Sequence, residues 1–229
     1  MNEFVSCIVA AGGSGTRMGT GKNKVFLKVD GIPVIALTLS TLDNCDVVSE
    51  IIVSTREEDI VEISEIAKQY NIKKIKTIVK GGDTRAESVL AASKEVSYEC
   101  DFVMIHDAAR PFVTDEIIFE TVNKSKDNGA AACGVKPKCT LKAINENGIV
   151  TDTVDRERTI EIQTPQVFCK ELFDKMYSFE TEVLKSATDD CVLAEKCGAE
   201  IFVTNGSYKN IKITTPEDME IAEIFLRRN

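Results

Sequence analysis

The sequence contains a single histidine, His106, and its eight cysteines include no pair spaced as Cys-x-x-Cys. Structural zinc sites are built from closely spaced cysteines and histidines, so both shortages argue against a zinc site. Several cysteines fall inside apolar segments, such as Cys7 in CIVAA and Cys133 in AACGV. A thiol in such a place behaves as a small apolar group, and free thiols are typical of a reducing compartment. We therefore expect a cytoplasmic protein.

Long apolar runs and an excess of positive charge are missing as well. No apolar stretch approaches the roughly 18 residues that are needed to cross a bilayer. The opening MNEFVSCIV lacks the basic start of a signal peptide. Asp and Glu number 37 against 28 Lys and Arg, which gives a net charge of −9. A nucleic-acid surface needs a basic face, so we expect neither a nucleic acid nor a membrane as partner.

Short apolar segments alternate with helical patterns along most of the chain. The predicted strands include 5–9, 51–55, 74–79 and 101–107, and helical spacing of apolar residues falls between them. A helix is predicted from Thr114, and another from Pro216 with Thr215 as its N-cap. This order predicts an α/β fold with a mostly parallel, Rossmann-like, doubly wound sheet. No repeat, low-complexity segment or linker interrupts the pattern, so we expect one domain over 1–229.

The segment 136–164 departs from this alternation because it has no helical pattern. Two short apolar stretches, TLKAI and IVTDTV, flank Asn147-Gly148, which is a hairpin signal. An isolated hairpin is marginally stable in water, yet these strands alternate as if one face were buried. We therefore expect a β-arm that a second copy of the chain covers, giving a closed homodimer. The alternative is a hairpin folded over its own domain.

A glycine-rich stretch follows the first predicted strand, in the sequence SCIVAAGGSGTRMGTGKNK. Its glycines allow the backbone to approach a ligand closely, and successive N–H groups in such a turn can bind an anion. The stretch matches neither the dinucleotide pattern Gly-x-Gly-x-x-Gly nor a P-loop. A phosphate site at the end of a strand is the favoured interpretation. A strand-to-helix turn with incidental basic residues is the alternative.

Polar residues collect at the ends of other predicted strands, in GGDTRAES, HDAARP and NIKIT. The carboxyl ends of strands meet at one edge of an α/β sheet, so these side chains should lie near the glycine-rich stretch. The residues in question are Asp83, Arg85, Ser88, Asp107, Arg110 and Lys212. Several cations around one strand-end aspartate are typical of a site for a polyphosphate and a divalent ion. His106 ends an apolar strand, and we expect it to pack rather than to act as a base.

Together these motifs resemble the 2-C-methyl-D-erythritol 4-phosphate cytidylyltransferase family, nucleotidyltransferases of the non-mevalonate isoprenoid pathway. The resemblance extends over essentially the whole chain, through AAGGSGTRMG, GGDTRAES, HDAARPF, TVDR, QTPQVF, SATDD and NIKITTPEDM. It implies a nucleotide-diphospho-sugar transferase type of fold and the transfer of a cytidylyl group from CTP to methylerythritol phosphate, with Mg²⁺ present. It also implies that the arm dimerises and delivers its arginine and threonine to the neighbouring subunit.

The resemblance further implies roles for the residues that match the family's motifs. Arg17 and Lys24 would stabilise the transition state, and Arg156 and Lys212 would position the attacking phosphate. The residues that would bind the nucleotide are Ala10, Ala11, Gly12, Gly13, Gly82, Asp83 and Ser88. Those that would contact the erythritol phosphate or the metal-bound phosphates are Asp107, Arg110, Thr140 and Thr188, with Asp107 also a ligand of Mg²⁺.

One stretch departs from the family pattern, which usually reads Pro-Lys-Gln around the second catalytic lysine. Here the sequence is GKNKVF, and Lys22 lies two residues before Lys24, so Lys22 is the alternative for that role. Two other functions stay open. A ribitol-5-phosphate cytidylyltransferase shares several motifs, although HDAARP and TVDR favour methylerythritol. A non-catalytic nucleotide-binding module would not need Arg17, Lys24, Arg156 and Lys212 together.

Overall fold

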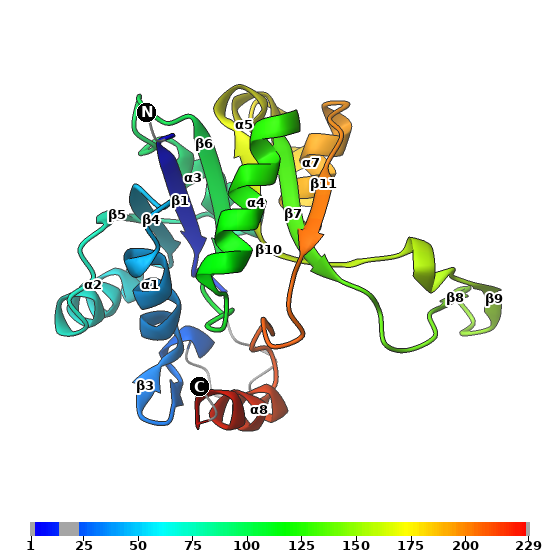
Figure 1. The fold of residues 1–229 in the computed structure, drawn as a ribbon, viewed down its shortest axis with the longest axis horizontal. Helices are drawn as coiled ribbons and strands as arrows, with labels where there is room; N and C mark the ends of the chain where they lie inside the picture. The colour runs from blue at the N-terminus through cyan, green and yellow to red at the C-terminus, as the bar shows by residue number, and fades with distance from the viewer. Residues whose placement is uncertain (1–2, 14–22, 228–229) are drawn as a thin grey trace.

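The computed structural model describes residues 3–13 and 23–227, and its centre is a seven-stranded sheet (Figure 1). The strand order is β11-β7-β10-β6-β1-β4-β5. The bounds are β1 Val5–Ala10, β4 Glu50–Thr55, β5 Ile75–Lys80, β6 Phe102–Asp107, β7 Ala130–Val135, β10 Glu161–Cys169 and β11 Phe202–Asn205. Only β10 runs antiparallel to its two neighbours, β6 and β7. The expected mostly parallel sheet is confirmed.

Helices cover both faces of this sheet, as a doubly wound fold requires. The helices α1 (Val34–Asn44), α2 (Ile60–Gln69) and α4 (Asp115–Asn128) pack on one face. The other face is covered by α3 (Arg85–Ser93), α5 (Lys170–Met176), α6 (Thr181–Ser186) and α7 (Asp190–Lys196). Within β1, Cys7 and Val9 belong to the first core and Ile8 to the second, which is the two-residue period of a strand buried on both faces.

Local sequence signals explain where the helices beside the site begin. Thr84 caps α3 and forms a reciprocal capping box with Glu87. The predicted helix from Thr114 is α4, and Thr114 caps it by accepting a hydrogen bond from the backbone of Ile117. These caps fix the points at which the chain leaves the sheet edge and enters a helix.

A smaller core lies below the carboxyl edge of the sheet. The short strand β2 (Lys28–Val29) pairs with β3 (Ile32–Pro33) and contacts α8 (Pro216–Arg227), the predicted last helix. The side chains that form this core are Val29, Val34, Phe112, Ile213 and Ala222. Asp218 accepts hydrogen bonds from the backbone N–H groups of Thr214 and Thr215 at the start of α8. The helix therefore anchors the segment that carries Lys212.

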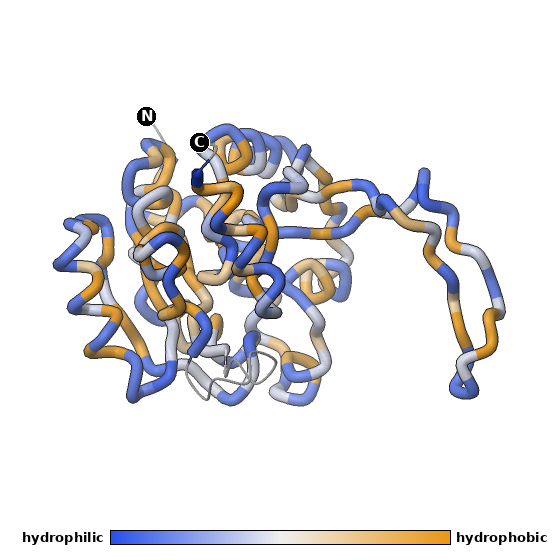
Figure 2. Tube along the Cα trace, turned by 90° about the horizontal axis from the view of Figure 1, so that it is seen from below, coloured by the Kyte–Doolittle hydropathy of each residue, from blue (hydrophilic) through white to orange (hydrophobic). Residues whose placement is uncertain are grey.

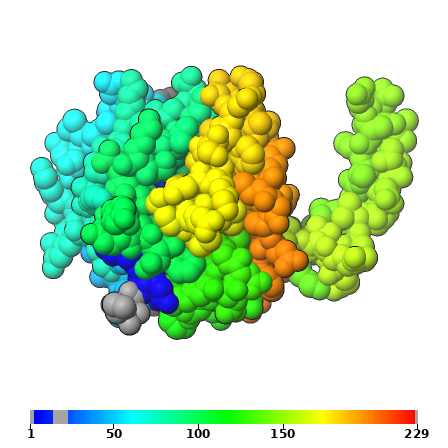
Figure 3. All heavy atoms as spheres, turned by 90° about the horizontal axis from the view of Figure 1, so that it is seen from above, coloured from blue at the N-terminus to red at the C-terminus, as the bar shows by residue number. Residues whose placement is uncertain are grey.

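The predicted arm stands clear of the body of the chain (Figures 1 and 3). It comprises β8 (Lys142–Ile144), β9 (Val150–Thr153) and the short helix η4 (Arg156–Arg158). Every residue of β8 and β9 is exposed, and the exposed fraction of Ile144 is 64%. Hydrophobic stretches are visible along the arm in Figure 2. The hairpin itself is confirmed, and it does not fold over its own chain.

None of the helices in the described ranges is long and apolar enough to cross a membrane.

Candidate active site

A pocket of about 340 Å³ opens at the carboxyl ends of the central strands. Three segments contribute to its wall. They are the glycines that follow β1, the turn before α3 and the end of β6. The lining residues are Ala10, Ala11, Gly12, Gly13, Lys24, Val25, Gly82, Asp83, Thr84, Arg85, Ser88, Asp107, Ala109 and Lys212. Segments from both halves of the chain therefore meet at one cavity, as the strand-end argument predicted.

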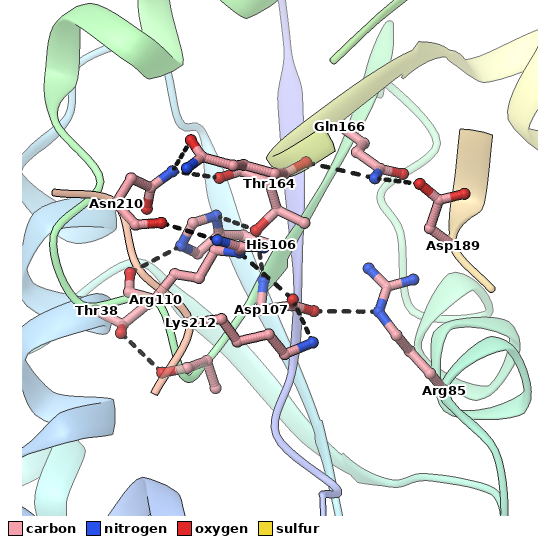
Figure 4. Close-up of polar contacts among 12 residues, drawn as sticks. Thr38, Arg85, His106, Asp107, Arg110, Thr164, Gln166, Asp189, Asn210 and Lys212 are labelled. Carbon is pink, nitrogen blue, oxygen red and sulfur yellow. Dashed lines mark hydrogen bonds and ion pairs between the residues drawn. The ribbon is translucent and has the colours of Figure 1, made fainter. Parts of the chain in front are cut away.

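Asp107, at the end of β6, is the buried carboxylate at the centre of a group of cations (Figure 4). Its Oδ1 lies 3.1 Å from Arg85 Nε, and its Oδ2 lies 2.7 Å from Lys212 Nζ and 3.6 Å from Arg110 Nε. Burial alone would raise the pKa of Asp107, but the surrounding cations outweigh it and hold this pKa well below its usual range. The carboxylate therefore stays ionised and fixes the direction of Lys212.

Arg85 joins Asp107 to the start of α7. Its Nη1 lies 2.5 Å from Asp190 Oδ2, and the hydroxyl of Tyr177 donates a hydrogen bond to the other oxygen of Asp190. Burial lowers the pKa of Arg85, but Asp190 and Asp107 raise it by more, so the guanidinium stays charged. The pair of aspartates and the arginine thus link α3, β6 and α7 beneath the pocket.

His106 is completely buried directly behind Asp107. Its Nε2 lies 3.2 Å from the carbonyl oxygen of Arg110, which can only accept, so Nε2 carries the proton. Nδ1 then accepts from the hydroxyl of Thr164 at 3.0 Å, and Thr164 accepts from the backbone N–H of Asp107 at 3.1 Å. Burial lowers the pKa of His106 to about 4. The imidazole is neutral and fully engaged, in agreement with the expected packing role.

The motif QTPQ in β10 organises the segments on either side of the pocket. Gln163 donates to the carbonyl oxygen of Ser207 at 2.9 Å. The side-chain oxygen of Gln166 accepts from the backbone N–H groups of Asp190 and Cys191, each at 3.2 Å. In the sequence, this motif could be identified only through the family resemblance. The partners Ser207 and Asp190 lie 44 and 24 positions away along the chain, so no local pattern could reveal the role of this motif.

The turn before α3 has room only for glycine. A Cβ atom on Gly82 would lie 2.4 Å from the Cβ of Glu87, and one on Gly81 would lie 2.6 Å from the hydroxyl oxygen of Ser88. That hydroxyl donates to the carbonyl oxygen of Thr84 at 2.9 Å and accepts from the backbone N–H of Gly82 at 3.2 Å. Ser88 thus shapes the turn that faces the pocket.

The predicted site residues differ in where they lie relative to the pocket. Those that line the pocket are Ala10, Ala11, Gly12, Gly13, Lys24, Gly82, Asp83, Ser88, Asp107 and Lys212. Arg110 lies against Asp107 and donates to the carbonyl oxygen of Asn210. Thr140 and Arg156 lie exposed in or beside the arm, and Thr188 lies exposed just before α7. Arg17 and its neighbour Lys22 are outside the described residues.

The carboxylates that line the pocket are the candidate protein ligands of the expected Mg²⁺. In the part of the chain that the structure describes, no three His, Cys, Asp or Glu side chains come together as a metal site. Asp107 and Asp83 are carboxylates of the lining. Mg²⁺ is commonly held by one or two carboxylates together with substrate phosphates. The residues present therefore fit an ion that arrives with a polyphosphate.

Comparisons with known proteins agree with the motifs. A family model described as 2-C-methyl-D-erythritol 4-phosphate cytidylyltransferase matches residues 5–228. A protein of that name from Caldanaerobacter subterraneus subsp. tengcongensis is 42% identical over 225 residues, covering 98% of this chain and 99% of the relative. One from Clostridium botulinum (strain ATCC 19397 / Type A) is 41% identical over 223 residues, covering 97% of each. The crystal structure of 4-diphosphocytidyl-2C-methyl-D-erythritol synthase from Anaerococcus prevotii DSM 20548 has a TM-score of 0.85 and 34% identity, with 99% of this chain and 97% of that chain covered.

Proposed function

Because the chain belongs to the 2-C-methyl-D-erythritol 4-phosphate cytidylyltransferase family, we propose that it transfers the cytidylyl group of CTP to 2-C-methyl-D-erythritol 4-phosphate. The products are 4-diphosphocytidyl-2-C-methyl-D-erythritol, a precursor of isoprenoids, and pyrophosphate. The observation that carries this proposal is the pocket itself, where Lys24, Lys212 and Arg85 line one cavity with a glycine backbone, and Lys212 and Arg85 contact the ionised carboxylate of Asp107.

The chemistry needs cations more than it needs a base. A phosphate oxygen of methylerythritol phosphate attacks the α-phosphorus of CTP, and the bond from that phosphorus to the β-phosphate oxygen breaks. The nucleophile is already an anion, so the protein has to align two negative groups and neutralise the charge that builds on them. Lys24 and Arg17 would stabilise that charge, and Lys212, held by Asp107, would position the attacking phosphate.

The glycine-rich backbone and the turn before α3 would bind the nucleotide. Backbone groups of Ala10, Ala11, Gly12 and Gly13 would line it, and the turn of Gly82 and Asp83, shaped by Ser88, would read the cytosine. A turn that hydrogen-bonds one base leaves its polar groups unpaired with another, which is how such a site selects a pyrimidine. Mg²⁺ would neutralise the phosphates of CTP, with those phosphates and Asp107 as its ligands. Arg110 would act through Asp107, with which it is paired. Thr188 would contact the erythritol phosphate.

We further propose that the chain is one catalytic domain that works as a homodimer through the arm of residues 136–164. The exposed aliphatic side chains of Ile144, Ile149 and Val150 give the arm an apolar surface that a second copy would cover. Most soluble oligomers are closed and symmetric, and two arms exchanged reciprocally satisfy that symmetry. Arg156 and Thr140 would then serve the pocket of the partner subunit.

The proposed function is tested by measuring pyrophosphate release from CTP with Mg²⁺ and each polyol phosphate. We expect turnover with methylerythritol phosphate, and much slower turnover when ATP or GTP replaces CTP. Faster release with ribitol 5-phosphate would instead identify the ribitol enzyme, the alternative raised by the shared motifs. Binding of CTP with no release for either acceptor would identify a non-catalytic module.

A further inference from the structure

Asn23 lies immediately before Lys24, at the position where the sequence departs from the family pattern, and it is 1% exposed. Its side-chain nitrogen donates to the carbonyl oxygen of Ala11 at 2.7 Å and to Asp59 Oδ2 at 2.9 Å. Its side-chain oxygen accepts from the backbone N–H of Val25 at 3.3 Å. All three hydrogen-bonding groups of this buried amide therefore have a role, which a solvated turn residue would not need.

Asp59 is itself held from the other side. Arg56 contacts both of its oxygens, with Nε 2.8 Å from Oδ2 and Nη2 3.0 Å from Oδ1. A two-pronged arginine contact fixes the plane of a carboxylate, and Asp59 is 5% exposed. Arg56 thus sets the direction in which Asp59 accepts the hydrogen bond from Asn23. Asp59 itself lies at the junction of η3 (Glu57–Asp59) and α2.

The Asn23 side chain hydrogen-bonds the backbone of two residues that line the pocket, Ala11 and Val25. Ala11 continues from β1 and lines the pocket, and its N–H donates to the backbone carbonyl oxygen of Ser54 at 2.8 Å. Lys24 begins η2 (Lys24–Phe26), for which Asn23 is the N-cap. The neighbour on the other side, Val25, is buried in the main core. Lys24 therefore projects from a backbone that is held on both sides, by a hydrogen-bonded amide and by a packed valine.

We infer that Asn23, oriented by Asp59 and Arg56, is a positioning residue that sets the direction of Lys24 relative to the glycine backbone that faces the phosphates. The inference rests on the proposed role of Lys24. Asn23 makes no contact with substrate in this role. It acts by keeping Lys24 and Ala11 in register, so its loss lowers the rate of the chemical step and leaves CTP binding nearly intact.

A double-mutant cycle on kcat tests this inference, with the variants Asn23→Ala, Lys24→Ala and both together. A misplacement of about 1 Å can cost a factor of 10² in rate, so we expect Asn23→Ala to lower kcat at least tenfold with KM for CTP changed less than threefold. Residues that act through one another are non-additive, so Asn23→Ala in the Lys24→Ala background should cost less than about twofold. The matched control is Glu58→Ala, which removes a surface partner of Arg56 at 3.1 Å and should leave kcat unchanged.

Each outcome bears on a separate statement. An equal loss from Asn23→Ala in both backgrounds, or an unchanged kcat in the wild-type background, overturns the inference and leaves the proposed function standing. An unchanged kcat in Lys24→Ala overturns the role of Lys24 in the proposed function. If Asn23→Ala does not fold, Asp59→Asn takes its place in the cycle. Asp59→Asn keeps an acceptor for Asn23 and weakens the hold of Arg56, so a smaller loss of the same non-additive kind is expected, and an additive loss contradicts the inference.

Discussion

At the scale of single residues, the pocket depends on how charges are paired. Asp107 holds Lys212 and Arg85 at hydrogen-bonding distance, and Asn23 holds the backbone N–H of Val25, directly after Lys24. The sequence predicted the charged members of this set because they follow predicted strands. It did not predict Asn23, Gln166 or Asp190, because their partners come from distant parts of the chain and only the folded sheet brings them together.

At this scale, we expect the loss of Lys24 and the loss of Lys22 to have different effects on kcat. Lys24→Ala should lower kcat by roughly 100-fold, as the loss of one group that stabilises a transition state does. Lys22→Ala should change kcat by less than a few-fold, because only a lysine aimed at the reacting phosphates acts in the transition state. Steady-state kinetics with both substrates saturating measures each effect. Equal losses, or the reverse order, would move the catalytic role to Lys22.

The burial of His106 predicts how the free energy of unfolding depends on pH. Its pKa is about 4 in the folded chain against 6.5 for an ordinary histidine, so between these values only the unfolded chain binds the proton. The free energy of unfolding therefore falls as the pH drops from 6.5 to 4, by at most about 3 kcal/mol from this group. Denaturant unfolding across that range should be less pH-dependent in His106→Gln than in the wild type. Identical pH profiles would show that His106 is not the source.

At the scale of elements, β10 is the strand that the alternating pattern did not foresee. It runs antiparallel between β6 and β7, and its polar side chains fix the segments before α7 and before α8. The predicted strand-and-helix order was correct for β1, β4, β5 and β6, where each strand has its own apolar run. The order of strands beyond β6 depends on pairing between distant segments, and no local period encodes such pairing.

Arg85 tests how far the link between α3, β6 and α7 stabilises the fold. Arg85→Met removes the cation that Asp107 and Asp190 share, which leaves buried Asp190 without its ionic partner. Breaking a buried ion pair costs about 3 to 5 kcal/mol, so the free energy of unfolding should fall by about 3 kcal/mol. Lys175→Met, which breaks an exposed surface pair with Glu171, is the matched control and should have no measurable effect. A loss below 1 kcal/mol in Arg85→Met would mean that the link is not structural.

At the scale of the whole molecule, the proposed homodimer would complete each site with the arm of the partner chain. Arg156 and Thr140 lie outside the pocket of their own chain, as described above, so the proposed homodimer is tested by complementation. Mixing Arg17→Ala with Arg156→Ala under subunit exchange gives mixed dimers. If Arg156 acts in the partner subunit, one of the two sites then carries neither mutation, and about half of the activity per mixed dimer should return. A mixture that stays inactive although heterodimers have formed would place Arg156 in its own chain's site.

The central claim is that a phosphate oxygen of methylerythritol phosphate attacks the α-phosphorus of CTP in the described pocket. Oxygen-18 in the non-bridging phosphate oxygens of methylerythritol phosphate follows that step directly, with phosphorus-31 NMR as the readout. The account predicts that the labelled oxygen becomes the bridge of the product, so both phosphorus signals of the diphosphate shift and pyrophosphate stays unlabelled. Label in pyrophosphate, a shift confined to the phosphorus that came from methylerythritol phosphate, or release of CMP without a diphosphate product would contradict it.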